Sequence, residues 1–376
     1  MSSKGLFQPI RIGNHELKHR VVLAPLTRLR ADPETHAPNE KHVQYYGQRA
    51  GNGGGLLITE ATHISPMAGS WPGTPAIYTK EQIEGWKKVT KAVHDRGSII
   101  FVQLWHVGRA THAAWLPNNA QPVSASAIAI NGPDSFGIPN EVPRALETDE
   151  IQDLINDYVQ AAKNGIEAGF DGVEIHGANG YIIDQFINSN TNQRTDRYGG
   201  SIENRTRLAL EVVDAVVKAV GADKTAIRFS PFNDFQDMDD ATPNDTWGYL
   251  VQQLQNNHPD LAYIHMVEPR FTFEDSAGSS EHNLDHFRNI WKSVFINAGG
   301  FGHDLAGAIE HAEKTGDLIA FGRYYIANPD LPYRLQQQLP LNAYNRATFY
   351  GAGPEGYTDY PTYEETQTAP ETTVTA

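Results

Sequence analysis

The stretch Asp171-Gly-Val-Glu-Ile-His176-Gly-Ala-Asn179-Gly-Tyr181 decides how the rest of the chain is interpreted. It begins with a short apolar strand, residues 172–175, and then breaks into glycines with hydrogen-bonding side chains among them. His176, Asn179 and Tyr181 can each donate a hydrogen bond, and tyrosine can also release a proton. A strand that ends in such a polar cluster is where an α/β protein usually places its chemistry. A βα turn with a capping His and Asn is the alternative.

Composition excludes several classes of protein. The chain has 376 residues, of which 40% are hydrophobic and 20% charged, and a net charge of −15. This charge argues against nucleic acid or an anionic membrane as a partner, because both need a basic surface. The absence of cysteine excludes disulfides, thiolate catalysis and cysteine-based metal sites. We find neither a transmembrane-length apolar run nor a secretory signal, so we expect a cytoplasmic protein.

Apolar runs alternate with helical patterns along the chain. After a β-hairpin at 6–20, turning at Gly13-Asn14, we expect buried strands at 21–27, 56–58, 98–104, 172–175, 226–229, 261–265, 294–296 and 318–321. Helices are expected at 39–50, 79–96, 149–168, 203–219, 246–256, 303–314 and 329–338. Eight short buried strands that alternate with helices favour a closed (β/α)8 barrel over an open doubly wound sheet.

The domain organisation expected from this pattern is simple. Length alone would allow two or three domains, but α/β barrels of this size fold as one. We therefore predict a single domain over residues 1–360, with a long insertion rich in Pro, Asn and Ser at 105–148 after the third strand. The Thr- and Glu-rich end, 361–376, has little to bury and is expected to be a loose tail.

The C-terminal ends of the eight strands predict a shared site, because these ends meet at one face of a barrel. The loops after the seventh and eighth strands are rich in glycine, and the second contains Arg323, a combination that suits phosphate. Gln103 offers an amide to a heteroaromatic edge, and Arg228 is a fixed positive charge. Together they indicate a phosphorylated ring cofactor that gains negative charge.

Seven motifs occur in order along nearly the whole chain. They are Ala24-Pro-Leu-Thr-Arg28, Thr59-Glu-Ala61, Gln103-Leu-Trp105-His-Val-Gly-Arg109, the stretch 171–205, Arg228-Phe-Ser-Pro231, Ala298-Gly-Gly300 and Phe321-Gly-Arg-Tyr324. Each is weak alone, but in this order the chain resembles the Old Yellow Enzyme family of FMN-dependent ene-reductases. Its ending, 345–361, resembles that of the pentaerythritol tetranitrate and N-ethylmaleimide reductase branch.

The resemblance implies a cofactor, a reductant and roles for the residues. NADPH or NADH would reduce a non-covalently held FMN, and the electrons would pass to an electron-poor alkene, either an α,β-unsaturated carbonyl or a nitroalkene. His176 and Asn179 would bind the substrate oxygen, and Tyr181 would protonate the α-carbon. FMN would be held by Pro25, Leu26, Thr27, Ala61, Gln103, His176, Arg228, Gly299, Gly300, Gly322 and Arg323. The substrate side would be lined by Trp71, where relatives often carry Tyr, by Trp105 and by Tyr350.

Several alternatives stay open. The same fold could carry a flavin-dependent isomerase, or an FMN-binding protein with vestigial catalysis, and the chain could be a monomer or a homodimer. His265 and Glu268 could form an acid–base or metal pair, but a core histidine is the more common case and we predict no metal site. Glu174 is expected not to share a site with His176, because neighbouring strand residues point to opposite faces.

Overall fold

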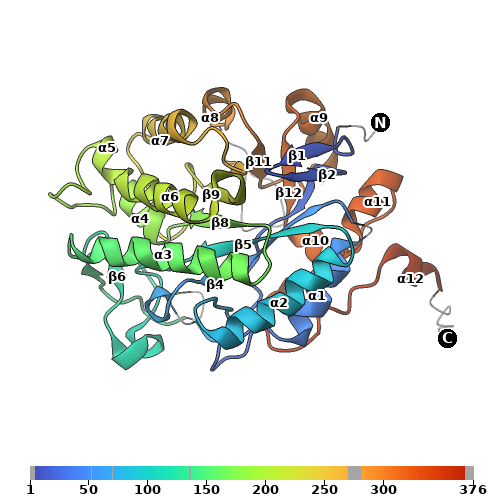
Figure 1. Ribbon diagram of the computed structural model, residues 1–376, viewed down its shortest axis with the longest axis horizontal. Helices are drawn as coiled ribbons and strands as arrows, with labels where there is room; N and C mark the ends of the chain where they lie inside the picture. The colour runs from blue at the N-terminus through green and yellow to red at the C-terminus, as the bar shows by residue number, and fades with distance from the viewer. Residues whose placement is uncertain (1–4, 52, 70, 135–136, 270–280, 369–376) are drawn as a thin grey trace.

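Eight parallel strands close into a barrel in the computed structural model, which describes residues 5–51, 53–69, 71–134, 137–269 and 281–368 (Figure 1). The strands follow one another around the barrel in chain order, which confirms the predicted (β/α)8 fold. They are β3 (Val21–Leu23), β4 (Leu56–His63), β5 (Ile99–Trp105), β8 (Gly172–Gly177), β9 (Thr225–Phe229), β10 (Tyr263–Val267), β11 (Phe295–Ala298) and β12 (Leu318–Phe321).

Most of the strands differ by one or more residues from their predicted ranges, and three of these differences are informative. β3 ends at Leu23 rather than at 27, because Pro25 has no N–H to continue the ladder. β4 is longer than predicted and reaches His63 across an irregularity between Ile58 and Ala61. β10 lies two residues later than predicted, and a two-residue shift keeps each side chain on its expected face.

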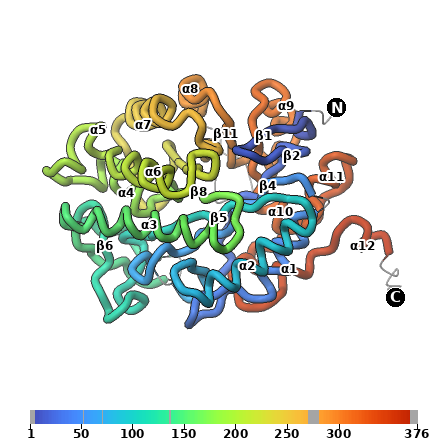
Figure 2. The backbone as a smooth tube through the Cα atoms, viewed as in Figure 1, coloured from blue at the N-terminus to red at the C-terminus, as the bar shows by residue number. Residues whose placement is uncertain are grey.

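Helices cover the outside of the barrel. The longer ones are α1 (Glu40–Ala50), α2 (Lys80–His94), α3 (Glu150–Glu167), α6 (Arg207–Val220), α7 (Pro243–Asn257), α9 (Leu305–Thr315) and α11 (Leu331–Gln337). The predicted capping box of α2 is present, since Thr79 and Gln82 each accept the other's backbone N–H. Neighbouring helices such as α3 and α6 lie side by side in both views (Figures 1 and 2).

Short elements depart from the predicted pattern. The predicted helix 203–219 is divided into α5 (Ile202–Arg205) and α6 at Thr206, whose hydroxyl donates back to the carbonyl of Ile202. We did not predict α4 (Ile182–Ile187), α8 (Asp285–Ile290) or α10 (Arg323–Ala327). The 105–148 insertion contains 3-10 turns and a two-stranded parallel pair, β6 (Val123–Ser124) with β7 (Arg144–Ala145).

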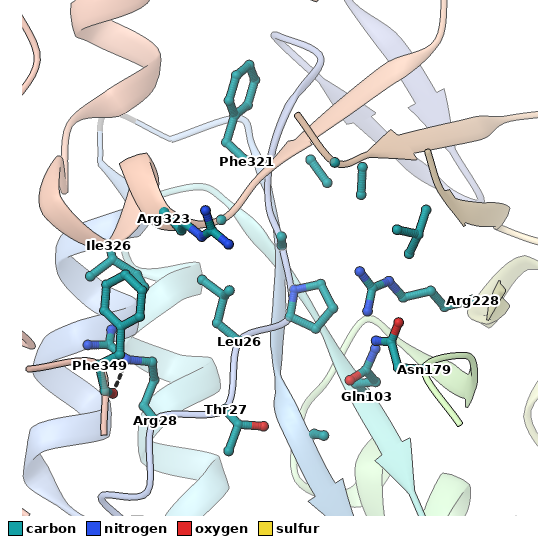
Figure 3. A pocket seen from close by; sticks show the side chains of 18 of the residues that line it. Leu26, Thr27, Arg28, Gln103, Asn179, Arg228, Phe321, Arg323, Ile326 and Phe349 are labelled. Carbon is teal, nitrogen blue, oxygen red and sulfur yellow. Dashed lines mark hydrogen bonds between the residues drawn. The ribbon is translucent and has the colours of Figure 1, made fainter. Parts of the chain in front are cut away.

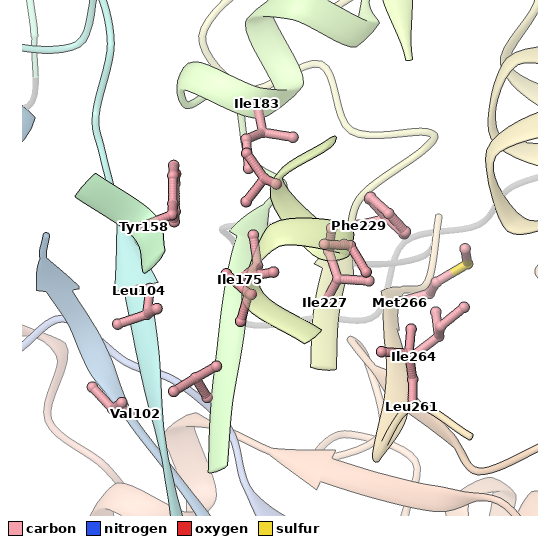
Figure 4. Packing of buried hydrophobic residues seen from close by; sticks show 14 of the residues in the cluster. Val102, Leu104, Tyr158, Ile175, Ile183, Ile227, Phe229, Leu261, Ile264 and Met266 are labelled. Atoms are coloured by element: carbon pink, nitrogen blue, oxygen red, sulfur yellow. The ribbon is translucent and has the colours of Figure 1, made fainter. Parts of the chain in front are cut away.

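Strand alternation divides the core into an outer and an inner part. One face of each strand packs under the helices, where Val102, Leu104, Ile175 and Ile227 belong to one buried cluster with Tyr158 of α3 (Figure 4). The intervening residues point into the barrel and form a second cluster that includes Phe101, Ala226, Tyr263 and Ile296. The expected hairpin, β1 (Ile10–Ile12) with β2 (His15–Leu17), is present, and its Ile12 and Leu17 belong to this inner cluster.

The range expected to be a loose tail, 361–376, begins with a short helix. Residues Tyr363–Thr368 form a short helix, α12, because the Tyr363 N–H bonds to Asp330 and the Arg334 guanidinium bonds to the carbonyl of Pro361. The last eight residues lie outside the described ones, and the division at residue 360 stays a prediction. In the part of the chain that is described, we find no helix long and apolar enough to cross a membrane.

Candidate active site

A cavity of about 480 Å³ opens at the C-terminal ends of the strands. It brings together every residue that the sequence predicted for the cofactor, the catalytic groups and the substrate side, from Pro25 in the first loop to Tyr350 near the end of the chain. The barrel explains this convergence, because all eight strands point their C-terminal ends at the same face.

Two cations lie at opposite sides of this cavity. Arg228 of β9 lies beside Gln103 of β5 and Asn179, whereas Arg323 lies across the cavity, with Leu26 between them (Figure 3). Near Arg323 the wall is made of glycines, and Gly299 and Gly300 have φ of +107° and +75°. Backbone in this left-handed region favours glycine and leaves N–H groups accessible to an anion. The two ends therefore suit a long ligand with a phosphate at one end and an electron-accepting ring at the other.

The Arg228 side chain provides a direct test of that interpretation. Its Nε is buried and has no hydrogen-bond partner among the described residues, and no ion pair is found for its guanidinium there. A buried N–H of a cation that has no acceptor is costly. An acceptor-rich ring that becomes anionic would remove this cost, so the residues present fit FMN.

His176 is held as a neutral hydrogen-bond donor. Burial lowers the pKa of His176 well below its usual value, and the nearby Arg228 and His265 lower it further. The ring Nδ1 lies 3.3 Å from the backbone N of Ala178 and accepts its hydrogen bond. A neutral imidazole carries one proton, so Nε2 is the nitrogen left to donate.

Asn179 is oriented by the loop after β9. Its backbone has a φ of +56°, a region that Asn tolerates better than most residues. Its N–H donates to Ser230 Oγ at 2.7 Å, and its amide oxygen accepts from Asn233 Nδ2 at 3.0 Å. Because the oxygen is engaged, the Asn179 Nδ2 group is free to donate to a ligand.

Tyr181 lies within an aromatic cluster. Its ring meets those of Trp105 and His176 edge-on, with centroids 4.9 and 5.0 Å apart, and Trp105 meets Trp71 in the same way at 5.3 Å. Burial raises the pKa of Tyr181 well above its usual value, so the phenol keeps its proton until a strong base forms beside it. Tyr350 lines the rim and is 62% exposed.

The structure corrects one prediction about neighbouring polar residues. Glu174 and His176 are two residues apart on β8 and therefore share the inward face, contrary to our expectation. Glu174 Oε2 lies 2.8 Å from His265 Nδ1, so the partner of His265 is Glu174 rather than Glu268. No cluster of metal-ligating side chains is found over the described ranges.

Sequence reasoning missed the residues that orient the donors. Ser230 lies in a quoted motif but received no role, and Asn233 had no signal at all, because its contact with Asn179 spans 54 residues. Phe349 and Arg346 also line the cavity, and they belong to an end segment that was noted only as a resemblance.

Asp184 should make stability depend on pH. It accepts the Gly180 N–H at 2.8 Å and so supports the loop that carries Asn179 and Tyr181. Burial raises the pKa of Asp184 to about 7, so the folded chain holds a proton that the unfolded chain releases above about pH 4. The free energy of unfolding should therefore fall, by a few kcal/mol at most, as pH rises from about 4 to 7.

The substitution Asp184→Asn removes the titrating group and should flatten this slope. Urea unfolding of both proteins at intervals between pH 4.5 and 8 measures the difference. Asp95, an exposed residue at the end of α2, offers a control, since Asp95→Asn should keep the wild-type slope. Identical slopes in wild type and Asp184→Asn would show that Asp184 is ionised throughout this range.

The closed parallel barrel has glycines and Arg323 at one end of its cavity and the partly buried cation of Arg228 at the other. This combination defines a barrel enzyme for a phosphorylated ring cofactor. Comparison of the chain with known proteins supports this class of enzyme. A family model described as the NADH:flavin oxidoreductase / NADH oxidase family matches residues 5–342. 12-Oxophytodienoate reductase 1 of Oryza sativa subsp. japonica is 50% identical over 364 residues, which are 96% of this chain and 93% of the relative.

Solved structures are similar as well. Morphinone reductase superimposes with a TM-score of 0.89 at 42% identity, covering 97% of this chain and 98% of that chain. Morphinone reductase in complex with tetrahydroNAD gives 0.87 at 43%, covering 95% and 97%. The chain therefore belongs to the NADH:flavin oxidoreductase / NADH oxidase family, which confirms the resemblance to Old Yellow Enzymes. It is an FMN enzyme that takes its electrons from a reduced nicotinamide.

Proposed function

We propose that the protein is an ene-reductase that reduces the C=C bond of an α,β-unsaturated carbonyl compound or a nitroalkene. The observation that carries this proposal is that His176, Asn179 and Tyr181 line the same cavity, with the rings of His176 and Tyr181 5.0 Å apart. Two of these residues are neutral donors and the third is a protonated phenol. Relatives named as reductases of 12-oxophytodienoate and morphinone support a reduction of this class.

FMN, when bound, supplies the hydride chemistry between the nicotinamide and the alkene. We assign its ring to the side of Thr27, Ala61, Gln103 and Arg228, and its phosphate to the side of Gly300, Gly322 and Arg323. Arg228 offers positive charge where the ring gains electrons. The remaining cofactor contacts are assigned to Pro25, Leu26, His176 and Gly299, all of which line the cavity.

The donor pair would activate the alkene. His176 Nε2 and Asn179 Nδ2 would both donate to the carbonyl or nitro oxygen, drawing electron density from the C=C bond and stabilising the negative charge that develops on this oxygen. Both donors are fixed before substrate binds, by Ala178 and by Asn233. They need no reorganisation during the reaction, which is what makes such donors effective.

Tyr181 would supply the proton. A phenol whose pKa is raised by burial does not lose its proton to water, yet it can give it to a carbanion-like α-carbon in contact with it. Trp105 packs against the Tyr181 ring and Trp71 packs against Trp105, and both would help to exclude water from the transfer. The presence of Tyr181 in the cavity supports a net reduction over the isomerase alternative, in which no external proton donor is needed.

The purified protein should be yellow and should bleach under anaerobic conditions when NADPH or NADH is added. Adding 2-cyclohexenone should then restore the yellow colour, and steady-state assays should show nicotinamide consumption that depends on the enone. A protein that bleaches but is not reoxidised by any enone, maleimide or nitroalkene would contradict the ene-reductase proposal while leaving the flavin chemistry intact.

A further inference from the structure

A buried carboxylate lies just below the floor of the cavity. Glu174 of β8 accepts a hydrogen bond from Gln103 Nε2 at 2.7 Å through one oxygen and is bonded to His265 Nδ1 at 2.8 Å through the other. Glu174 and His265 are both 0% exposed. Glu174 contributes nothing to the donor set for the substrate, so it requires a separate explanation.

Glu174 carries a negative charge inside the barrel. Burial works to raise the pKa of Glu174, but His265, Arg228 and the hydrogen bonds from His265 and Gln103 outweigh it, and the pKa lies below its usual value. Burial lowers the pKa of His265, although the Glu174 carboxylate works to raise it. Arg228 is the permanent positive charge that acts on Glu174.

The sheet places Glu174 between the two polar residues assigned to the ring. Gln103 is its direct neighbour on β5, and on β9 its neighbour is Ala226, two residues before Arg228 on the same inward face. No ion pair joins Glu174 to Arg228 within the described chain, so the guanidinium can still bond to a ligand in the cavity. The negative charge of Glu174 nevertheless acts on Arg228. The interaction is electrostatic, without a shared hydrogen bond.

Glu174 also determines which way the Gln103 amide points. Since Nε2 donates to the carboxylate, the carbonyl oxygen of Gln103 is left as the acceptor for the cavity that this residue lines. An acceptor at that position suits an N–H on the edge of a heteroaromatic ring. An apolar residue at 174 would leave the Gln103 amide without a fixed orientation and the Arg228 charge without a carboxylate nearby.

We propose that Glu174 is a positioning residue for the cofactor. Glu174 fixes the orientation of the Gln103 amide and offsets the charge of Arg228, and it thereby weakens the preference of the cavity for reduced over oxidised FMN. The inference rests on the assignment of this cavity to FMN. The physical reason is that reduced FMN carries negative charge near Arg228, whereas oxidised FMN does not. A carboxylate nearby therefore destabilises the reduced form selectively.

The test compares Glu174→Gln with Glu174→Asp in the FMN-loaded protein. Glu174→Gln removes the charge at nearly constant shape and should favour reduced over oxidised FMN by about tenfold, which appears as a rise of about 30 mV in the two-electron midpoint potential. Glu174→Asp keeps the charge but is too short to reach Gln103 and His265 together. It should leave the potential close to that of the wild type and weaken FMN binding, measured by titrating the apoprotein.

Each outcome decides a separate point. An unchanged potential in Glu174→Gln, or equal shifts in both variants, would overturn the electrostatic role. Unchanged FMN affinity in Glu174→Asp would overturn the positioning role, and this variant still decides if Glu174→Gln fails to fold. Failure of the wild-type protein to bind FMN would instead contradict the assignment of the cavity itself.

Discussion

Replacing Tyr181 with Phe is expected to slow reoxidation of the reduced enzyme by an enone by about 10²–10⁴-fold, the usual contribution of a general acid. Reduction by the nicotinamide should stay nearly unchanged, because it requires no proton at the α-carbon. Stopped-flow absorbance of the flavin follows the two half-reactions separately. The predicted signature is thus a loss confined to one of them.

The geometry explains why Phe is the suitable substitution. The Tyr181 ring packs edge-on against Trp105 and His176, and Phe keeps these contacts while it removes only the hydroxyl. Tyr158→Phe is a matched control, because Tyr158 is also buried but lies on α3, outside the cavity. Comparable losses in both half-reactions of Tyr181→Phe would point to a distorted cavity and contradict the role as proton donor.

The fold and much of the site follow from local patterns in the sequence. The two-residue period of a strand determines which side chains enter the barrel, and chain order determines their neighbours. Gln103, His176, Arg228 and Arg323 could therefore be assigned to one cavity before any contact was known. The same rule should have placed Glu174 on the inward face, because it lies two residues from His176 on one strand. We had treated the two as adjacent residues that point to opposite faces, and the contact of Glu174 with His265 shows otherwise.

What could not be predicted is held by contacts between distant parts of the chain. Arg30 donates hydrogen bonds to the carbonyls of Thr348, Phe349, Gly353 and Glu355 and so fixes the segment that carries Tyr350 into the rim of the cavity. An exposed arginine and a buried one look alike in a sequence. Only the folded backbone shows that free carbonyl groups more than 300 residues away require its donors.

Replacing His176 with Ala should weaken the binding of 4-nitrophenol by about 10- to 100-fold, because a hydrogen bond to a charged oxygen contributes about 1.5–3 kcal/mol. The phenolate would take the place of the substrate oxygen between His176 and Asn179. Asn179→Ala should have a similar effect. The double variant should lose less than the sum of the two, since both donors act on one oxygen.

The pH dependence of this binding distinguishes a neutral His176 from a charged one. Because burial lowers the pKa of His176 well below its usual value, the ring is neutral around neutral pH. Affinity for the phenol should then rise with pH through the phenol's own ionisation and level off. An imidazolium would give the opposite trend, since the loss of its proton near pH 6.5 would weaken phenolate binding as pH rises. Absorbance titrations across this range measure the difference, and a decline in affinity above pH 6.5 would show that the donor is cationic.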